Sequence, residues 1–235
     1  MAYRIVQFPR VGSTNDIAML AAEAGSEPGL VVQAQEQVRG KGRKARDWVS
    51  PQGGLWASVV LTPGVPALVG GHIPLAVGSA VAEALGKTGV QVGVRWPNDL
   101  MIGDEKVGGI LVESKAREGV LGPVVAGMGI NVTNPPPLEH ATSLAEHGFQ
   151  GGPREALDRI LARLSAYERW LASGDAQRLG EKFMERAWGI GRELLLDGTP
   201  CKPTEIAVDG ALIIQRPDGT IEIARAGSLR LPGEP

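Results

Sequence analysis

The sequence changes character near residue 188, and this change limits the folds that the chain can adopt. Before it, segments with helical periodicity alternate with short apolar segments. After it, residues 189–235 show no helical pattern and hold short β-type runs joined by "VDGA" and "PDGT". Because Asp-Gly pairs between such runs are strong hairpin signals, we predict a small β-barrel or sheet in this part. We expect an α/β domain over residues 1–187 and a C-terminal β domain over residues 188–235.

The first part of the chain is predicted to alternate between helices and strands. Helices are expected at residues 12–25, 73–86, 153–171 and 175–188. Strands are expected at residues 3–8, 30–35, 55–61 and 90–96, with a hairpin over 97–114 and one long strand or a strand pair over 120–132. Ser13 is the expected N-cap of the first helix, and Gly25 is expected to end it.

The composition excludes several classes of protein. The chain has 235 residues, of which 43% are hydrophobic, and this is enough for a substantial core. Its single cysteine, Cys201, excludes an internal disulfide and a zinc site built from cysteines. The net charge of −2 argues against a general nucleic-acid or membrane-surface binder. We see neither a signal peptide nor a run of roughly 20 apolar residues that would cross a bilayer, so we expect a cytoplasmic protein.

A local cluster of positive charge stands out against this composition. In "RGKGRKARDW", residues 39–48, five of the eight residues from Arg39 to Arg46 are basic. Glycines between cations allow the backbone to approach a phosphate, and Trp48 could stack on a base. No helix signal follows, which excludes a dinucleotide-binding fingerprint. Charge alone favours a solvated loop over a ligand-binding loop.

Four further motifs carry polar residues or glycines at the ends of predicted elements. They are "GSTND" (12–16), "RWPNDL" (95–100), "DEKVGGIL" (104–111) and "GMGINV" (127–132). Each has an ordinary structural interpretation when it is taken alone: a helix cap, an Asx-type turn, or glycines at a close packing contact.

The five motifs together, in this order and spacing, closely resemble the biotin protein ligase family over nearly the whole chain. The resemblance implies an α/β catalytic domain with a mixed sheet like that of class II aminoacyl-tRNA synthetases, and an SH3-like C-terminal domain. It implies that MgATP activates biotin to biotinyl-5′-AMP. Biotin would then pass to one lysine of a biotin carboxyl carrier protein, a domain of acetyl-CoA carboxylase or a related carboxylase.

The resemblance also implies roles for individual residues. Those matching the family's biotin-binding positions are Ser13, Thr14, Asn15, Gln37, Lys41, Gly42, Arg43, Lys106 and Gly109. Those matching positions on the ATP and adenylate side are Arg43, Trp48, Lys106, Asn131 and Arg230. Arg43, Lys106 and Asp99 are the implied catalytic residues, with Asp99 placed to orient the incoming lysine amine. The resemblance does not indicate which residues would bind the Mg²⁺ ion.

The sequence departs from the family pattern at three positions. Lys41 stands where arginine is usual and cannot form its two-pronged contact. Ala45 replaces a common glycine, which should stiffen the loop, and Arg95 replaces a lysine. Since "GSTND" begins at residue 12, we expect no DNA-binding domain and no DNA partner. The family includes monomers and dimers, so a homodimer stays open.

Two alternatives compete with this interpretation. A lipoate–protein ligase has a related fold and the same chemical logic, but it lacks the basic glycine loop and the "WPND" motif in this form. A non-catalytic RNA- or nucleotide-binding protein would use residues 39–48 as an electrostatic contact, and its binding would weaken steeply with salt.

Overall fold

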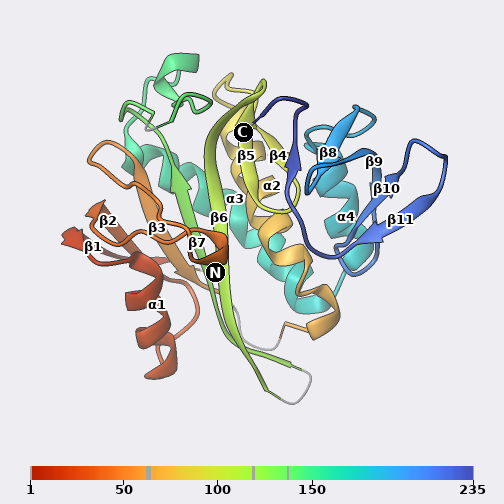
Figure 1. The fold of residues 1–235 in the computed structure, drawn as a ribbon. Coiled ribbons are helices and arrows are strands. Elements are labelled where there is room, and N and C mark those ends of the chain that lie inside the picture. The colour runs from red at the N-terminus through yellow and green to blue at the C-terminus, as the bar shows by residue number, and fades with distance from the viewer. Residues whose placement is uncertain (1, 62–64, 118–119, 137, 235) are drawn as a thin grey trace.

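The computed structural model describes residues 2–61, 65–117, 120–136 and 138–234. Two sheets organise the chain, as Figure 1 shows: a large sheet at the centre and a smaller one formed by the blue C-terminal strands at its side. The large sheet has seven strands in the order β1-β2-β3-β7-β6-β5-β4. Only β1 and β2 pair in parallel, so the sheet is mixed. Its strands are β1 (Arg4–Val11), β2 (Leu30–Gln37), β3 (Leu55–Val60), β4 (Gly93–Arg95), β5 (Asp99–Ile102), β6 (Glu105–Arg117) and β7 (Val120–Ile130).

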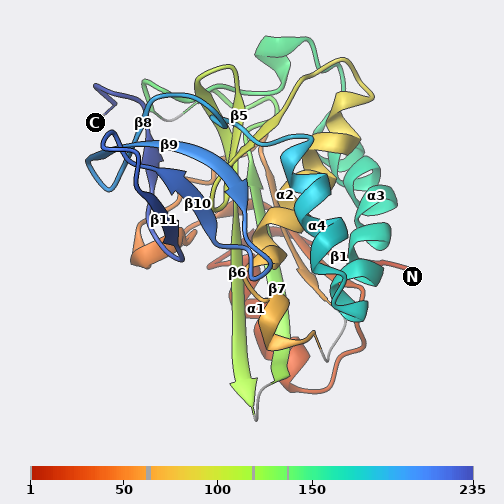
Figure 2. The same cartoon turned by 90° about the vertical axis from the view of Figure 1, so that its right-hand side faces the viewer.

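Helices cover both faces of the large sheet. They are α1 (Thr14–Glu23), α2 (His72–Gly86), α3 (Pro153–Ser173) and α4 (Ala176–Met184), with short 3₁₀ turns at Arg43–Ala45, Ala67–Val69 and Ala145–His147. Helix α1 lies on one face, and α2, α3 and α4 stack on the other, as Figure 2 shows from the side. Strand β2 explains this division, because Val31 belongs to the core under α2 while Leu30 and Val32 pack with α1.

Helix α3 shows how the sequence sets an element's ends. Pro153 stands at its first position, and Gly174 follows it with φ +70°, a conformation that glycine adopts without strain. Its predicted apolar stripe is buried at Leu157, Ile160, Leu161, Leu164, Tyr167 and Leu171. The stripe packs against α2, which is buried along most of its length.

The C-terminal residues form a five-stranded antiparallel sheet in the order β11-β10-β9-β8-β12. Its strands are β8 (Leu194–Leu196), β9 (Thr199–Ile206), β10 (Leu212–Gln215), β11 (Ile221–Ala224) and β12 (Leu229–Arg230). The two Asp-Gly turns join β9 to β10 and β10 to β11. Their glycines, Gly210 and Gly219, have φ of +82° and +87°. The β9–β10 turn rests on the large sheet, because Trp96 Nε1 donates to the carbonyl of Gly210 at 3.1 Å. Placing the domain boundary between residues 187 and 188 stays a prediction.

Three details differ from the sequence prediction. Ser13 occupies the N-cap of α1, but its side chain makes no capping hydrogen bond. The helix expected to reach residue 188 ends at Met184, because residues 186–188 pair with Val94 instead. The strand expected at 90–96 is limited to β4, although Val90 and Val92 are still buried in the core. No helix among the described residues is both long enough and apolar enough to cross a membrane.

Candidate functional site

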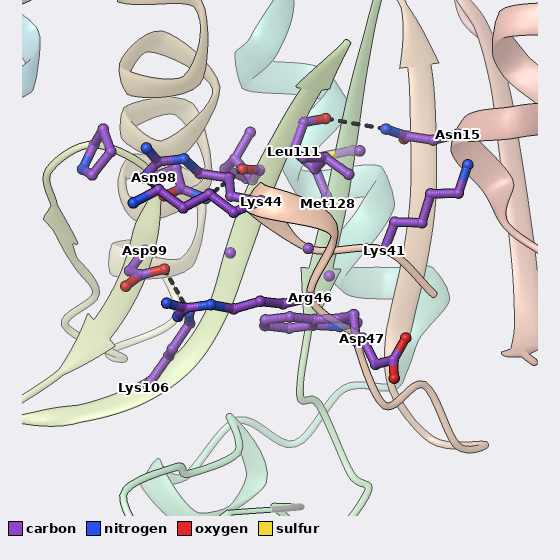
Figure 3. A pocket seen from close by; sticks show the side chains of 18 of the residues that line it. Asn15, Lys41, Lys44, Arg46, Asp47, Asn98, Asp99, Lys106, Leu111 and Met128 are labelled. Carbon is purple, nitrogen blue, oxygen red and sulfur yellow. Dashed lines mark hydrogen bonds and ion pairs between the residues drawn. The ribbon is translucent and has the colours of Figure 1, made fainter. Parts of the chain in front are cut away.

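A cavity of about 250 Å³ lies on the face of the large sheet that carries α1. Its floor is formed by β6 and β7, its walls by the N-terminus of α1 and the turn before β5, and its cover by residues 41–48. Figure 3 shows the side chains of Asp99 and Lys106 pointing toward each other, with Lys41 toward the opposite wall. Residues from all five motifs therefore meet in one place, although they are far apart in the sequence.

The basic loop folds back on itself over this cavity. Gly42 N donates to the carbonyl of Arg46 at 2.7 Å, and Trp48 N donates to that of Gly40 at 2.9 Å. A side chain at Gly40 would place its Cβ 2.3 Å from the Trp48 carbonyl oxygen, so this crossing requires glycine. Folding in this way spreads the cations of the loop across the mouth of the cavity.

Each principal cation of the site has a defined partner. Arg43 Nη1 donates to Asn98 Oδ1 at 3.1 Å and to the carbonyl of Gly227 at 3.4 Å, so it reaches from the loop to the C-terminal sheet region. Lys41 Nζ lies 2.5 Å from Asp16 Oδ1, in an exposed ion pair at the start of α1.

Asp99 is held between two cations at the start of β5. Its Oδ1 lies 2.5 Å from Lys106 Nζ, and its Oδ2 lies 3.0 Å from Arg95 Nη2. Burial raises the pKa of the Asp99 carboxyl, but Lys106 and Arg95 outweigh that effect and leave the pKa below its ordinary value. Asp99 is therefore an ionised carboxylate that can accept hydrogen bonds.

The opposite end of the cavity is lined by the polar side chains of Thr14, Asn15 and Gln37. Gln37 Oε1 accepts from the backbone N–H of Thr14 at 2.8 Å and from its hydroxyl at 3.0 Å. Asn15 Nδ2 donates to Glu113 Oε2 at 2.7 Å, and the Ser58 hydroxyl donates to Asn15 Oδ1 at 2.6 Å. Linked hydroxyls and amides of this kind fix one another's orientation and present defined donors and acceptors to a ligand.

Sequence reasoning missed Ser58, which is fully buried at the centre of this polar cluster. The sequence pattern could have indicated it, because Ser58 is the single polar residue in the buried strand "LWASVV". A buried hydroxyl needs a partner, so such a residue in a strand indicates a polar neighbour packed on that face of the sheet, and here the neighbours are Thr14 and Asn15 of α1.

Two glycines of β7 leave space for other side chains at the floor of the cavity. A Cβ at Gly129 would lie 2.6 Å from Trp48 Nε1, and a Cβ at Gly127 would lie 2.3 Å from Asn15 Oδ1. The glycines of "GMGINV" therefore make room for Trp48 and Asn15. Trp48 Nε1 is buried without an acceptor among the described residues, and Lys106 Nζ lies 5.2 Å from the centre of the indole ring.

Eleven of the predicted site residues line this cavity. They are Ser13, Thr14, Asn15, Gln37, Lys41, Gly42, Arg43, Trp48, Asp99, Lys106 and Gly109. The cavity also contacts residues outside the prediction, among them Lys44, Arg46, Asp47, Asn98 and Leu111.

The other two predicted residues, Asn131 and Arg230, are not part of the cavity lining. Asn131 is buried and donates to the carbonyl of Thr142 at 3.0 Å, while Arg230 pairs with β8 through Leu195. Their proposed contacts with adenine and ATP stay predictions.

The arrangement suits an anionic ligand with a polar, uncharged far end. Lys106, Arg43 and the loop cations would neutralise negative charge near Asp99, and the Thr14–Gln37 cluster would bind an amide-like group. Among the described residues, no group of three or more His, Cys, Asp or Glu side chains is placed to hold a metal ion.

Comparison with known proteins agrees with the resemblance seen in the sequence. Residues 7–131 match the family described as "Biotin/lipoate A/B protein ligase family". The chain is 31% identical to a biotin–[acetyl-CoA-carboxylase] ligase of Paracoccus denitrificans, over 89% of this chain and 93% of that protein. It is 33% identical to the bifunctional ligase/repressor BirA of Bacillus subtilis, over 96% of this chain and 74% of that protein.

A solved structure is similar in fold over almost its full length. It is a biotin protein ligase from Aquifex aeolicus in complex with biotin and ATP, with a TM-score of 0.78 and 27% identity over 96% of this chain and 97% of that one. The predicted fold class, a mixed-sheet catalytic domain like that of class II synthetases with an SH3-like β unit, is confirmed.

Proposed function

The chain belongs to the biotin/lipoate A/B protein ligase family, and from this premise we propose that it is a biotin–carrier-protein ligase. It is an ATP-dependent biotin ligase that activates biotin to biotinyl-5′-AMP. It transfers biotin to a specific lysine of a biotin carboxyl carrier protein. The observation that carries the proposal is the cavity itself, in which a polar cluster around Gln37 and a cationic centre around Lys106 share one space.

The first step joins two anions, and this is the problem that the cations solve. A carboxylate oxygen of biotin attacks the α-phosphorus of ATP, an O–P bond forms, and pyrophosphate leaves. Lys106 and Arg43 would stabilise the charge that concentrates around the phosphorus, and the cavity would hold the reactants in line. No side chain has to act as a nucleophile in this step.

The second step needs an uncharged amine and a place for its proton. The lysine nitrogen of the carrier attacks the carbonyl carbon of the mixed anhydride, an amide bond forms, and AMP leaves. Asp99 would orient the amine through a hydrogen bond or take the proton that it loses, and its lowered pKa favours the orienting role. The loop of residues 39–48 would exclude water, which otherwise hydrolyses the anhydride.

Magnesium enters this proposal as the companion of ATP. Mg²⁺ binds largely through phosphate oxygens and water, with only one or two protein carboxylates, so a site built by the protein alone is not required. The cytoplasm, where ATP is supplied, is the compartment in which we place the reaction.

A direct assay tests the proposal and separates it from its alternatives. The protein is incubated with MgATP, a carrier domain, and either biotin or lipoate, and the mass of the carrier is measured. We expect a mass increase for one biotinyl group. A preference for lipoate would indicate a lipoate ligase, and binding of RNA without any carrier modification would indicate the non-catalytic alternative.

Lys106→Ala is expected to slow biotin-dependent pyrophosphate release by about 100-fold or more, because it removes a cation aimed at the reacting phosphate. Lys87→Ala, an exposed lysine at the end of α2, is the matched control and should behave like the native protein. Near-native pyrophosphate release by Lys106→Ala at saturating biotin would contradict this role.

A further inference from the structure

Arg95 joins the candidate site to the segment that follows β12. Its side chain is buried, with 7% of its surface exposed. Nη2 donates to Asp99 Oδ2 at 3.0 Å, while Nη1 donates to both carboxylate oxygens of Glu234 at 2.8 and 2.9 Å. The guanidinium also lies over the ring of Trp188, 5.4 Å from its centre. One arginine therefore links Asp99 to a carboxylate that is more than a hundred residues away in the sequence.

Glu234 is fixed in its position by the backbone around it. Its own N–H donates to the carbonyl of Leu231 at 3.1 Å, and the N–H of Leu231 donates to Glu234 Oε2 at 2.9 Å. This reciprocal pair closes a tight turn and leaves the carboxylate aimed at Arg95. A charged side chain held by both a backbone donor and a buried arginine is ordered on both sides.

The charges of this group balance only when Glu234 is present. Asp99 faces two cations, Arg95 and Lys106, and Glu234 supplies the second negative charge. Without it, Asp99 would be the one carboxylate among the described residues that pairs with this buried guanidinium, and Arg95 would draw that carboxylate toward itself. The fork of Arg95 instead divides between the two carboxylates, which holds Asp99 at the edge of the cavity.

We infer that Glu234 is a positioning residue for the transfer step, acting through Arg95 to hold Asp99 where the incoming amine can reach it. The inference rests on the proposed function. During transfer, Lys106 faces the negative charge of the intermediate, so Arg95 is the remaining cationic partner of Asp99. The geometry of Asp99 at that moment then depends on how Glu234 holds Arg95.

The test measures the two half-reactions of the full-length protein separately. Glu234→Gln keeps the shape of the side chain and removes its charge. We expect it to lower the maximal rate of transfer from purified biotinyl-AMP to a biotin carboxyl carrier domain by about tenfold, since misplacing a reacting group by about 1 Å can cost ~100-fold. The carrier concentration at half-maximal rate, and the rate of adenylate formation from biotin and ATP, should change by no more than about twofold.

Two comparisons distinguish positioning from a general effect on the fold. Glu222→Gln removes a carboxylate on β11 that pairs with Arg216 at 2.7 Å, and it should leave both half-reactions unchanged. In an Asp99→Asn background, Glu234→Gln should lower transfer no further, because residues that act through one group are not additive. Rates are measured below the melting temperature of each variant.

Three results would overturn the inference while the proposed function stands. They are native transfer by Glu234→Gln, an equal loss in both half-reactions, and a full effect of Glu234→Gln in the Asp99→Asn background. If the native protein forms no biotinyl-AMP, the proposed function itself fails, and that outcome is recognised before any variant is compared.

Discussion

Two residues at the tip of the basic loop have backbone conformations that L-amino acids avoid. Lys44 has φ +56° and Ala45 has φ +57°, both in the left-handed region. A residue with a Cβ is strained there by about 1–2 kcal/mol relative to its ordinary conformation, whereas glycine is not. Ala45, which departs from the family pattern, therefore does more than stiffen the loop. In the conformation that folds over the cavity, the backbone is strained at this residue.

Ala45→Gly is expected to stabilise this loop conformation. We predict that it raises the free energy of unfolding by about 0.5–1 kcal/mol, because relief of strain exceeds the added flexibility of glycine in the unfolded chain. Chemical denaturation measures this. Ala226→Gly, at an exposed loop alanine outside the left-handed region, is the control and should lower stability slightly. Equal losses for both variants would show that residue 45 is not strained.

Individual residues also show which spatial groupings a sequence can indicate, while their roles toward a ligand stay predictions. Thr14, Asn15 and Gln37 are polar residues at the ends of strong elements, and the sheet brings those ends together. Glu234 gave no such signal, because nothing local distinguishes a carboxylate near "LPGEP" that happens to meet Arg95 in three dimensions. Pairings between distant segments depend on the packing of whole units, which no local pattern encodes.

At the scale of elements, the close approach of β6 and β7 gives neighbouring glycines different tasks. A Cβ at Gly129 would meet the Trp48 side chain at 2.6 Å, and a loop side chain can move aside. A Cβ at Gly108 would meet the Gly129 carbonyl oxygen at 2.5 Å and Ile130 Cα at 3.1 Å, which are backbone atoms of the paired strand. Gly129 therefore leaves space for Trp48 at the cavity, whereas Gly108 allows β6 and β7 to pair closely.

Alanine at these two positions should separate ligand binding from stability. We expect Gly129→Ala to raise the KM for ATP by about tenfold, because it displaces Trp48, which we propose stacks on the adenine base, and such a contact is worth about 1–3 kcal/mol. Gly108→Ala should instead lower the free energy of unfolding by about 2 kcal/mol, because strands must move apart. Adenylation kinetics and thermal melts of both variants check this. The reverse pattern would contradict the division of roles.

Element boundaries were the least predictable feature, and α4 shows the physical reason. The helical pattern continues past Met184, yet Val94 N donates to the Arg186 carbonyl at 2.8 Å and Trp188 N donates to the Val94 carbonyl at 2.9 Å. Pairing with the edge strand β4 replaces the last turn of the helix. Local propensity is a weak preference that such tertiary hydrogen bonds override.

At the scale of the molecule, one contact fastens the edge strand of the large sheet to the longest helix. Tyr3, just before β1, donates from its hydroxyl to Glu168 Oε2 at 2.6 Å, and Glu168 on α3 is buried with 4% exposed. Its other oxygen, Oε1, has no partner among the described residues. Burial raises the pKa of the Glu168 carboxyl, an effect that the hydrogen bond from Tyr3 opposes without cancelling.

This raised pKa makes the stability of the whole fold depend on pH in a defined direction. The unfolded chain loses the Glu168 proton near its ordinary pKa of about 4.3, whereas the folded chain keeps it to higher pH. Between those two values the folded state binds more protons than the unfolded state. The contribution of Glu168 to the free energy of unfolding is therefore full below the unfolded pKa and is lost as pH rises through the folded pKa.

Glu168→Gln should remove this contribution, because glutamine does not ionise. We expect the free energy of unfolding of the variant, minus that of the native protein, to rise as pH rises above the unfolded pKa of this carboxyl and to level off once the carboxyl has also ionised in the folded protein. Denaturation at a series of pH values measures it, and taking the difference cancels the titration of every other carboxylate. The same comparison can be made in a Tyr3→Phe background, which lacks the opposing hydrogen bond. There the rise should extend to higher pH. A difference that is flat across this range would show that Glu168 ionises in the folded protein as it does in the unfolded chain.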